Sequence, residues 1–309
     1  MRSDYPVITV NGPTCTGKTG VAVLLAERLG GEVVSCDSMQ IYRGLDIGTA
    51  KPTGEEMKRI RHHLVGFLDP SIGYSAADYV RDASKACDDI AGRGYIPILC
   101  GGTGMYVDAL LRDGGFPGEE RSGSAAAYDG ETTEDLYLRL TGIDPVYAGK
   151  ISRNDRRRIE RALEVFDTTG EKVSDHRYFR SGKLRDNALL CVLTYRDRSL
   201  LYERIGQRVD EMLESGLIAE AEYVYENRDR FITAAQAIGY KELFPFIEGN
   251  ASLEECAEKL KKATRNYAKR QMTWFRREED AFFIEADGLK KEDIATIIED
   301  RARAIELIP

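Results

Sequence analysis

The chain has 309 residues, of which 42% are hydrophobic and 31% charged, as expected for a globular protein with one large or two moderate domains. Its formal net charge is −8. Taken alone, this acidic balance argues against nucleic-acid binding, because neutralising phosphates requires clustered Lys and Arg. The sequence has no membrane-spanning apolar run, no signal-peptide pattern and no paired cysteines. We therefore expect a cytoplasmic protein with no membrane attachment.

Residues 1–112 predict alternating strands and helices. Apolar, largely β-branched runs predict buried parallel strands at 7–10, 32–36 and 96–100. Apolar residues at helical spacing predict helices at 21–29 and 76–92. Such alternation is typical of the α/β class, in which helices flank a parallel sheet.

The pattern changes after residue 112, where residues 114–118 are rich in Gly and Pro and residues 122–133 predict a linker. The remaining elements predicted from periodicity are helices at 134–140, 155–168, 199–225 (one helix, or two broken at Gly216), 253–277 and 291–307, and strands at 188–195 and 282–284. We therefore expect a core domain of residues 1–112 and 187–309 that carries a helical insertion domain at residues 113–186.

Residues 12–19, the phosphate-binding loop, match the pattern G-x-x-x-x-G-K-[ST] between a predicted strand and a predicted helix. The glycines let backbone N–H groups turn towards a phosphate, Lys18 adds a cation, and the Thr19 hydroxyl can hold Mg²⁺. The alternative is a glycine-rich turn without a ligand. The residues predicted to bind phosphate are Gly12, Pro13, Thr14, Cys15, Thr16, Gly17, Lys18 and Thr19.

Asp37 follows the strand at 32–36, which we expect to lie one strand along from the phosphate-binding loop. At the carboxyl end of a parallel sheet, such a carboxylate can act as a base towards an acceptor nucleophile. The strand at 96–100 ends in Gly and Thr rather than in the Asp of a nucleotide hydrolase. These features favour group transfer to a second substrate, and the alternative for Asp37 is a helix N-cap formed with Ser38.

Residues 37–52 (DSMQIYRGLDIGTAKP) closely resemble the signature of the tRNA dimethylallyltransferase, or tRNA isopentenyltransferase, family. Further segments similar to that family are the phosphate-binding loop, Gly101–Tyr106, Ile238–Glu242, Thr264–Gln271 and Trp274–Arg276. The resemblance covers nearly the whole chain and implies a bacterial-type enzyme with a P-loop, kinase-like fold. Such an enzyme transfers the dimethylallyl group of dimethylallyl diphosphate to the exocyclic amine of the adenosine just 3′ of the anticodon, with Mg²⁺.

The resemblance also implies the roles of individual residues. The phosphate-binding loop would hold the diphosphate leaving group, Thr103 and Arg208 would complete the cradle, and Asp37 would be the general base. Thr103 could otherwise be a turn residue, and Arg208 a solvated helix residue. The residues implied to contact tRNA are Asp37, Ser38, Met39, Gln40, Thr103, Arg157, Arg158, Ile159, Glu160, Arg161, Ile238, Gly239, Tyr240 and Lys241.

Two of these side chains have a second possible role. Gln40 could read a base edge or be a solvated loop residue, and Tyr240 could stack on a base or pack inside the protein. The interval between Pro117 and Leu136 is shorter than is usual in the family, so we expect fewer contacts with the anticodon stem.

The positive charge is concentrated in two segments. Residues 150–185 contain 11 Lys or Arg against 6 Asp or Glu, and residues 259–277 contain 8 Lys or Arg and no acid. Either run alone is typical of a solvated helical face, but together with the RNA-modification signature they predict a basic clamp on tRNA. We thus expect a monomer whose partners are the tRNA anticodon stem-loop and dimethylallyl diphosphate.

Three other functions remain open at this point. The first is an adenylate isopentenyltransferase, which prenylates free AMP, ADP or ATP. The second is a small-molecule kinase, since Asp37 beside a phosphate-binding loop also suits phosphoryl transfer. The third is a non-catalytic RNA-binding protein that retains a nucleotide switch.

Overall fold

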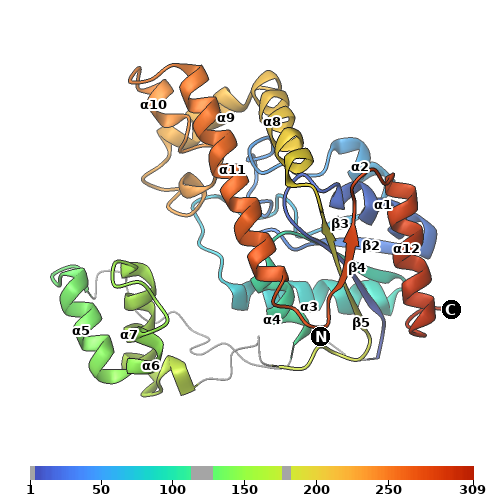
Figure 1. The fold of residues 1–309 in the computed structure, drawn as a ribbon, viewed down its shortest axis with the longest axis horizontal. Helices are drawn as coiled ribbons and strands as arrows, with labels where there is room; N and C mark the ends of the chain where they lie inside the picture. The colour runs from blue at the N-terminus through green and yellow to red at the C-terminus, as the bar shows by residue number, and fades with distance from the viewer. Residues whose placement is uncertain (1–3, 113–127, 176–181) are drawn as a thin grey trace. The chain divides into compact units, whose positions relative to one another are not determined.

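The computed structural model describes residues 4–112, 128–175 and 182–309 (Figure 1). The chain forms two compact units: unit 1 comprises Met1–Leu110 and Arg185–Pro309, and unit 2 comprises Leu111–Leu184. Residues 122–127 of the linker predicted at 122–133, and most of the short interval that follows Pro117, lie outside the described residues. Among the helices of the described part, none is long and apolar enough to cross a bilayer.

Unit 1 is built on a six-stranded parallel sheet in the order β3-β2-β4-β1-β5-β6. The strands are β1 (Val7–Asn11), β2 (Gly31–Ser35), β3 (His62–His63), β4 (Ile96–Gly101), β5 (Ala188–Thr194) and β6 (Phe282–Glu285). Every residue of β1 is buried, as its apolar run predicts for a central strand. The predicted α/β class, with a parallel sheet flanked by helices, is confirmed.

One expected neighbour relation is wrong. β4 pairs with both β1 and β2, with Ile98 opposite Ile8 on one side and Val33 on the other. Asp37 therefore follows a strand that is two positions, not one, from the strand before the phosphate-binding loop. The order of parallel strands depends on crossover connections between distant segments, which the apolar runs do not encode.

The helices of unit 1 are α1 (Lys18–Leu29), α2 (Gly54–Arg59), α3 (Ala76–Gly92), α4 (Gly104–Leu111), α8 (Arg198–Glu214), α9 (Leu217–Glu226), α10 (Phe244–Ile247), α11 (Leu253–Phe275) and α12 (Lys291–Ala304). α1 and α12 pack together over one face of the sheet (Figure 1). α3 packs on β2 and β4. Gly216, with a φ of 100°, separates α8 from α9, which settles the predicted alternative in favour of two helices.

A second core of unit 1 lies where the loop after β2 packs on α9 and α11. Ile41, Tyr42 and Leu45 from this loop are each at most 1% exposed and belong to one cluster with Leu217 of α9 and Leu260 of α11. The long loop between β2 and α2 is therefore a packed part of the fold rather than a solvated connection.

Unit 2 is a small helical unit of α5 (Thr133–Ile143), α6 (Pro145–Ala148) and α7 (Arg156–Thr169). Its core includes Leu136 and Leu140 from α5 and Ile159 and Leu163 from α7, each at most 1% exposed. The apolar face of α7 is thus turned inward, which leaves Arg157 and Arg158 near its start exposed.

Candidate active site

The phosphate-binding loop connects β1 to α1 at the carboxyl end of the sheet. Gly12 has a φ of 138°, and a Cβ there would overlap the carbonyl of Leu193 on the neighbouring strand. Gly17 has a φ of 85° and is the N-cap of α1. Both positions need glycine, and they turn the loop so that its backbone N–H groups and the start of α1 face one place.

Lys18 is folded over this loop. Its Nζ donates to the carbonyl of Pro13 at 2.5 Å, and the Thr16 hydroxyl donates to the same oxygen at 2.9 Å. Burial lowers the pKa of Lys18, and the nearby Asp37 carboxylate raises it. Arg208 on α8 is half-buried and close enough for its charge to lower the pKa of Lys18 further. The structure therefore brings Lys18, Asp37 and Arg208 into one electrostatic neighbourhood.

Asp37 is held by its own loop. Its Oδ1 accepts the N–H groups of Met39 at 2.9 Å and Gln40 at 3.4 Å. These bonds close a turn, and since the next helix begins only at Gly54, the alternative of a helix N-cap at Asp37 is wrong. Burial raises the pKa of Asp37, while these bonds and the charge of Lys18 act against that rise. A carboxylate whose pKa is raised and whose orientation is fixed suits a general base.

Thr103 joins two of the strand ends. Its backbone N–H donates to the carbonyl of Cys36 at 3.1 Å, and its hydroxyl accepts the N–H of Ser38 at 3.1 Å. The loops after β2 and β4 are thereby fixed to each other. Thr103 directly precedes α4, and its contacts with Cys36 and Ser38 place it beside Asp37.

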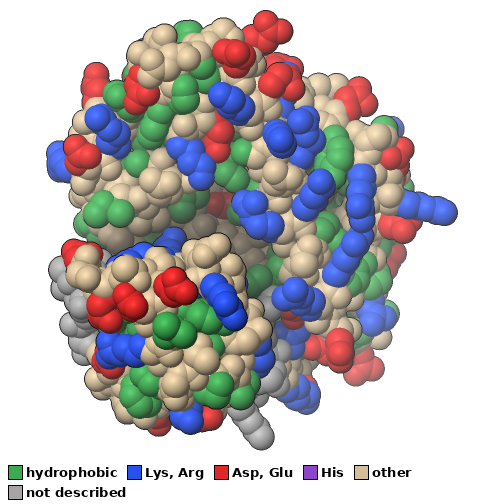
Figure 2. Space-filling view, turned by 60° about the vertical axis from the view of Figure 1, so that its left-hand side comes forward, with side chains coloured by type: hydrophobic (Ala, Val, Ile, Leu, Met, Phe, Trp, Pro, Cys, Tyr) green, Lys and Arg blue, Asp and Glu red, His purple; other side chains and the backbone are tan. Residues whose placement is uncertain are grey.

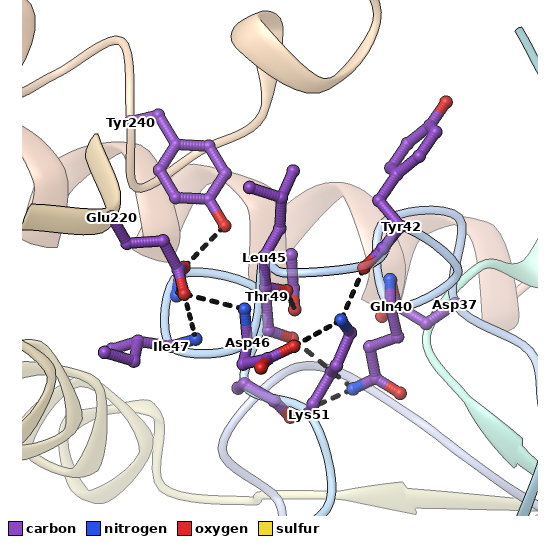
Figure 3. Close-up of polar contacts among 12 residues, drawn as sticks. Asp37, Gln40, Tyr42, Leu45, Asp46, Ile47, Thr49, Lys51, Glu220 and Tyr240 are labelled. Atoms are coloured by element: carbon purple, nitrogen blue, oxygen red, sulfur yellow. Dashed lines mark hydrogen bonds and ion pairs between the residues drawn. The ribbon is translucent and has the colours of Figure 1, made fainter. Parts of the chain in front are cut away.

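The loop after β2 is anchored by Glu220 of α9 (Figure 3). No motif in the sequence indicates this residue. The Glu220 carboxylate accepts the N–H groups of Asp46, Ile47 and Gly48 at 2.7–2.9 Å. It also accepts the hydroxyl of Tyr240 at 2.8 Å. Three successive N–H groups form a concave anion site, which here holds a side chain of the same protein.

Tyr240 and Gln40 make internal contacts. Tyr240 is 0% exposed, and its ring packs so closely on Gly48 that a Cβ there would overlap it. Tyr240 therefore packs inside the protein. A tRNA base cannot stack on its ring, because the ring is fully buried. The Gln40 amide donates to the Ala50 carbonyl at 3.0 Å, within the loop drawn in Figure 3. It also accepts the Ser35 hydroxyl at 3.1 Å.

The other residues expected to contact tRNA differ in exposure. Lys241 is exposed, Ile238 is half-buried, and Gly239 is buried with a φ of 115°. In unit 2, Arg157 and Arg158 are exposed, whereas Ile159 is 0% exposed. A tRNA contact at Ile159 can then involve only its backbone, because its side chain belongs to the core of unit 2.

Glu160 and Arg161 form ion pairs within α7. Glu160 pairs with Arg156 at 2.6 Å, and Arg161 pairs with Glu164 at 2.8 Å. In unit 1, Lys and Arg side chains gather on one face of the molecule (Figure 2). The exposed bases on α11 are Lys259, Lys262, Lys269 and Arg270.

Two further contacts fix the phosphate-binding loop from outside. Arg204 of α8 donates from Nε to the Cys15 carbonyl at 3.0 Å. Gln271 of α11 accepts the Thr14 N–H at 2.9 Å. Both residues are far from the loop in sequence, and no local pattern marks them as part of a site.

The hydroxyl oxygen of Thr19 is a chemically suitable ligand for a magnesium ion. Among the described residues no group of three or more His, Cys, Asp or Glu could hold a metal. Thr19 is the second residue of α1 and offers a hydroxyl oxygen, the type of ligand that Mg²⁺ prefers. The remaining ligands would be diphosphate oxygens and water, which is the usual arrangement for Mg²⁺ at a phosphate site.

A parallel sheet with this loop after a central strand, and with Asp37 and Thr103 at neighbouring strand ends, defines a P-loop protein of the group-transfer class. Comparison with known proteins identifies the family. The model of the IPP transferase family matches residues 40–278, and a model described as isopentenyl transferase matches residues 6–68. The chain belongs to the IPP transferase family.

Similar proteins and structures support the same assignment. A tRNA dimethylallyltransferase of Bacillus subtilis is 42% identical over 307 residues, covering 96% of this chain and 98% of the relative. The tRNA isopentenylpyrophosphate transferase of Bacillus halodurans is 39% identical with a TM-score of 0.71, covering 98% of this chain and 97% of the other. A eukaryotic dimethylallyltransferase acting on tRNA has a TM-score of 0.83 at 29% identity, covering 97% and 80%.

Proposed function

We propose that this protein is a tRNA dimethylallyltransferase that moves the dimethylallyl group of dimethylallyl diphosphate to the exocyclic amine of the adenosine just 3′ of the anticodon, releasing diphosphate. The observation that carries the proposal is that the loop after β1, with Lys18, and Asp37, after β2, stand at the same carboxyl edge of one parallel sheet, in a chain that belongs to the IPP transferase family. A cradle for a diphosphate and a base for the acceptor would then share one edge of the sheet, with the end of β4 between them.

The donor half of the reaction needs stabilisation of negative charge. When the allylic C–O bond breaks, positive charge spreads over the allyl group while negative charge grows on the diphosphate. Lys18, held by the Pro13 carbonyl, and the N–H groups of the phosphate-binding loop are fixed donors for that charge, and Arg208 would add a further cation near Lys18. Mg²⁺ held by Thr19 would neutralise further charge on the diphosphate oxygens.

The acceptor half needs orientation of a weak nucleophile. The exocyclic amine of adenosine has a lone pair that is delocalised into the ring. Asp37 would accept a hydrogen bond from this amine, orient it, and take its proton as the new C–N bond forms. The bonds from Met39 and Gln40 fix the carboxylate for this step before the substrate arrives.

The tRNA must present the adenosine outside the base stack, as other base-modifying enzymes require. We infer that the exposed bases on α11 and at the start of α7 attract the phosphate backbone of the anticodon stem-loop. The buried Ile159, in the core of unit 2, would support the start of α7 from behind.

One experiment distinguishes the four candidate functions. The protein is incubated with dimethylallyl diphosphate and Mg²⁺ together with either unmodified tRNA or AMP, and in parallel with ATP and tRNA. We expect prenylated product on tRNA alone. Product on AMP alone would identify an adenylate isopentenyltransferase, and phosphoryl transfer from ATP would identify a kinase. Binding of tRNA without any product would identify a binding protein.

A further inference from the structure

We propose that Gln271 of α11 is a positioning residue for the transfer reaction, because it holds the phosphate-binding loop in register with the loop that carries Thr103. This inference rests on the proposed function and adds a residue that acts through others rather than by touching the substrate.

One face of α11 meets the loop that follows β4. Tyr267, Gln271 and Trp274 are four and three residues apart, so they lie on the same side of the helix. The Trp274 Nε1 donates to Oδ2 of Asp108 at 2.7 Å. The Tyr267 side chain lies beside those of Thr103 and Gln271, and Asp37 is close enough to raise its pKa. This helix face is therefore the wall behind the strand ends that carry the site.

The Gln271 amide is bonded at both of its ends. Its Oε1 accepts the Thr14 N–H at 2.9 Å, and its Nε2 donates to the Gly102 carbonyl at 3.0 Å. The side chain is 5% exposed, so water does not replace these bonds when they break. A single buried amide thus bridges the loop after β1 and the loop after β4.

The loop after β4 is shaped to receive this helix face. A Cβ at Gly102 would overlap the Gln271 amide, and a Cβ at Gly104 would overlap the Trp274 ring. Both glycines have ordinary φ values, so the close approach of α11, rather than backbone conformation, explains why a side chain is absent there.

Register between these two loops decides where charge is stabilised. The loop after β1 carries the N–H groups and Lys18 that would hold the diphosphate, and the loop after β4 carries Thr103 beside Asp37. A misplacement of about 1 Å between reacting groups can lower a rate by roughly 10²-fold. Loss of the Gln271 bridge should therefore act on the prenyl donor and leave the tRNA surfaces unchanged.

A double-mutant cycle tests this bridge from both sides. Gly102→Ala displaces the amide, whereas Gln271→Ala removes it. In the double variant the nearest remaining atom to the new Cβ is the Gly12 carbonyl oxygen at 3.3 Å, which must shift by only a few tenths of an ångström. We expect each single variant to lower kcat/KM for dimethylallyl diphosphate about tenfold or more, with KM for tRNA within about twofold of the wild type. The double variant should be no lower than the worse single variant within about twofold, because both changes break the same bridge.

The matched control is Thr273→Ala on the same helix. Thr273 is exposed and donates to the carbonyl of Lys269 within α11. We expect this variant to keep wild-type kinetics. Thermal unfolding of all variants shows whether a loss of activity comes from unfolding or from a shift between the loops after β1 and β4.

A conservative variant keeps the test valid if the alanine variants do not fold. In Gln271→Glu the introduced carboxyl, when protonated, can still accept from Thr14 and donate to Gly102. As it ionises, the donor is lost and two acceptors face each other. Burial raises the pKa of a carboxyl at this position above its ordinary value. The ratio of kcat/KM for this variant to that of the wild type should therefore fall about tenfold as the pH rises through that pKa.

The outcomes separate this inference from the proposed function. Calorimetric binding of pyrophosphate with Mg²⁺ gives a second readout, which should weaken in the Gly102→Ala and Gln271→Ala variants. A wild-type protein that neither binds pyrophosphate nor prenylates tRNA would remove the proposed function. Normal wild-type activity with unaffected single variants, multiplicative losses in the double variant, or a pH-independent ratio for Gln271→Glu would overturn the role of Gln271 alone.

Discussion

The cradle around the phosphate-binding loop and the basic start of α7 both present polar groups, but they are held differently. In the cradle, half-buried groups are bonded across long stretches of sequence, as Thr14 is to Gln271. On α7, exposed arginines form ion pairs with residues within one helical turn, such as Arg158 with Asp155 at 3.3 Å. Fixed groups away from water can stabilise a developing charge, whereas exposed charges act through a screened, long-range attraction.

This difference separates two kinds of variant. Changes in the cradle should lower the rate of transfer even when both substrates saturate the enzyme. Changes on the exposed basic surfaces should weaken tRNA binding and its salt dependence while the rate at saturation stays the same. Each of the following variants tests whether transfer rate and tRNA binding are affected separately.

The largest effect is expected for Lys18→Met. The variant keeps the length of the side chain but removes the cation that faces the diphosphate, and we expect the single-turnover rate to fall roughly 10³-fold. Lys58→Met, an exposed position on α2, is the control and should keep the wild-type rate. A normal rate for Lys18→Met at saturating dimethylallyl diphosphate would contradict the cradle.

Asp37→Asn should lower the single-turnover rate about 10²-fold, because an amide can accept the Met39 N–H but cannot take a proton from the amine. Burial raises the pKa of Asp37, so the base form is lost at a higher pH than for an ordinary Asp. The acid limb of kcat/KM should thus lie above pH ~4 in the wild type and be absent in the variant. A wild-type pH profile in Asp37→Asn would exclude Asp37 as the base.

A double charge reversal, Arg157→Glu with Arg158→Glu, should raise KM for tRNA about tenfold at low salt and leave kcat within about twofold. The slope of log KM against log salt should become smaller, because fewer phosphates are neutralised. The matched control reverses Lys58 and Lys85, which are exposed on α2 and α3. An equal loss of affinity in that control would show that net charge, not the start of α7, determines tRNA binding.

The smallest effect on transfer is expected for Glu32→Gln, at the end of β2 that is opposite to Asp37. Hydrogen bonds from Arg93 and His63 lower the pKa of Glu32 to about 2. The stabilisation is therefore complete above the unfolded-state pKa of about 4.3 and is lost as the pH falls towards 2. Glu32→Gln should reduce the unfolding free energy at pH 7 by about 1–3 kcal/mol and flatten its acid dependence, with kinetics unchanged.

The regular elements could be predicted because their signals are local. The helix at 76–92 agrees with α3 at both ends, since Ser75 and Asp78 form a capping box at its start. β3, of only two residues, and α4, which follows a glycine cluster, lack a periodic run long enough to be seen. The position of β4 between β1 and β2 depends on pairing between distant segments, so the local pattern of apolar residues does not predict it.

The candidate site was predictable only in part, for a similar reason. The phosphate-binding loop and Asp37 stand directly after strands, where the motif and the sheet edge indicate a site. Gln271 and Glu220 act on loops more than a hundred residues away, so only the folded chain reveals their contacts. The burial of Tyr240 and Ile159 likewise depends on packing partners from other segments.

The central claim is that chemistry at Asp37 and tRNA binding at the start of α7 are separable. The direct test is the single-turnover rate of tRNA prenylation at saturating tRNA and dimethylallyl diphosphate, measured for Asp37→Asn and for the Arg157→Glu, Arg158→Glu double variant. We predict a loss of about 10²-fold for the first and a wild-type rate for the second. A wild-type rate for Asp37→Asn, or a comparable loss at saturation in the double variant, would contradict the account.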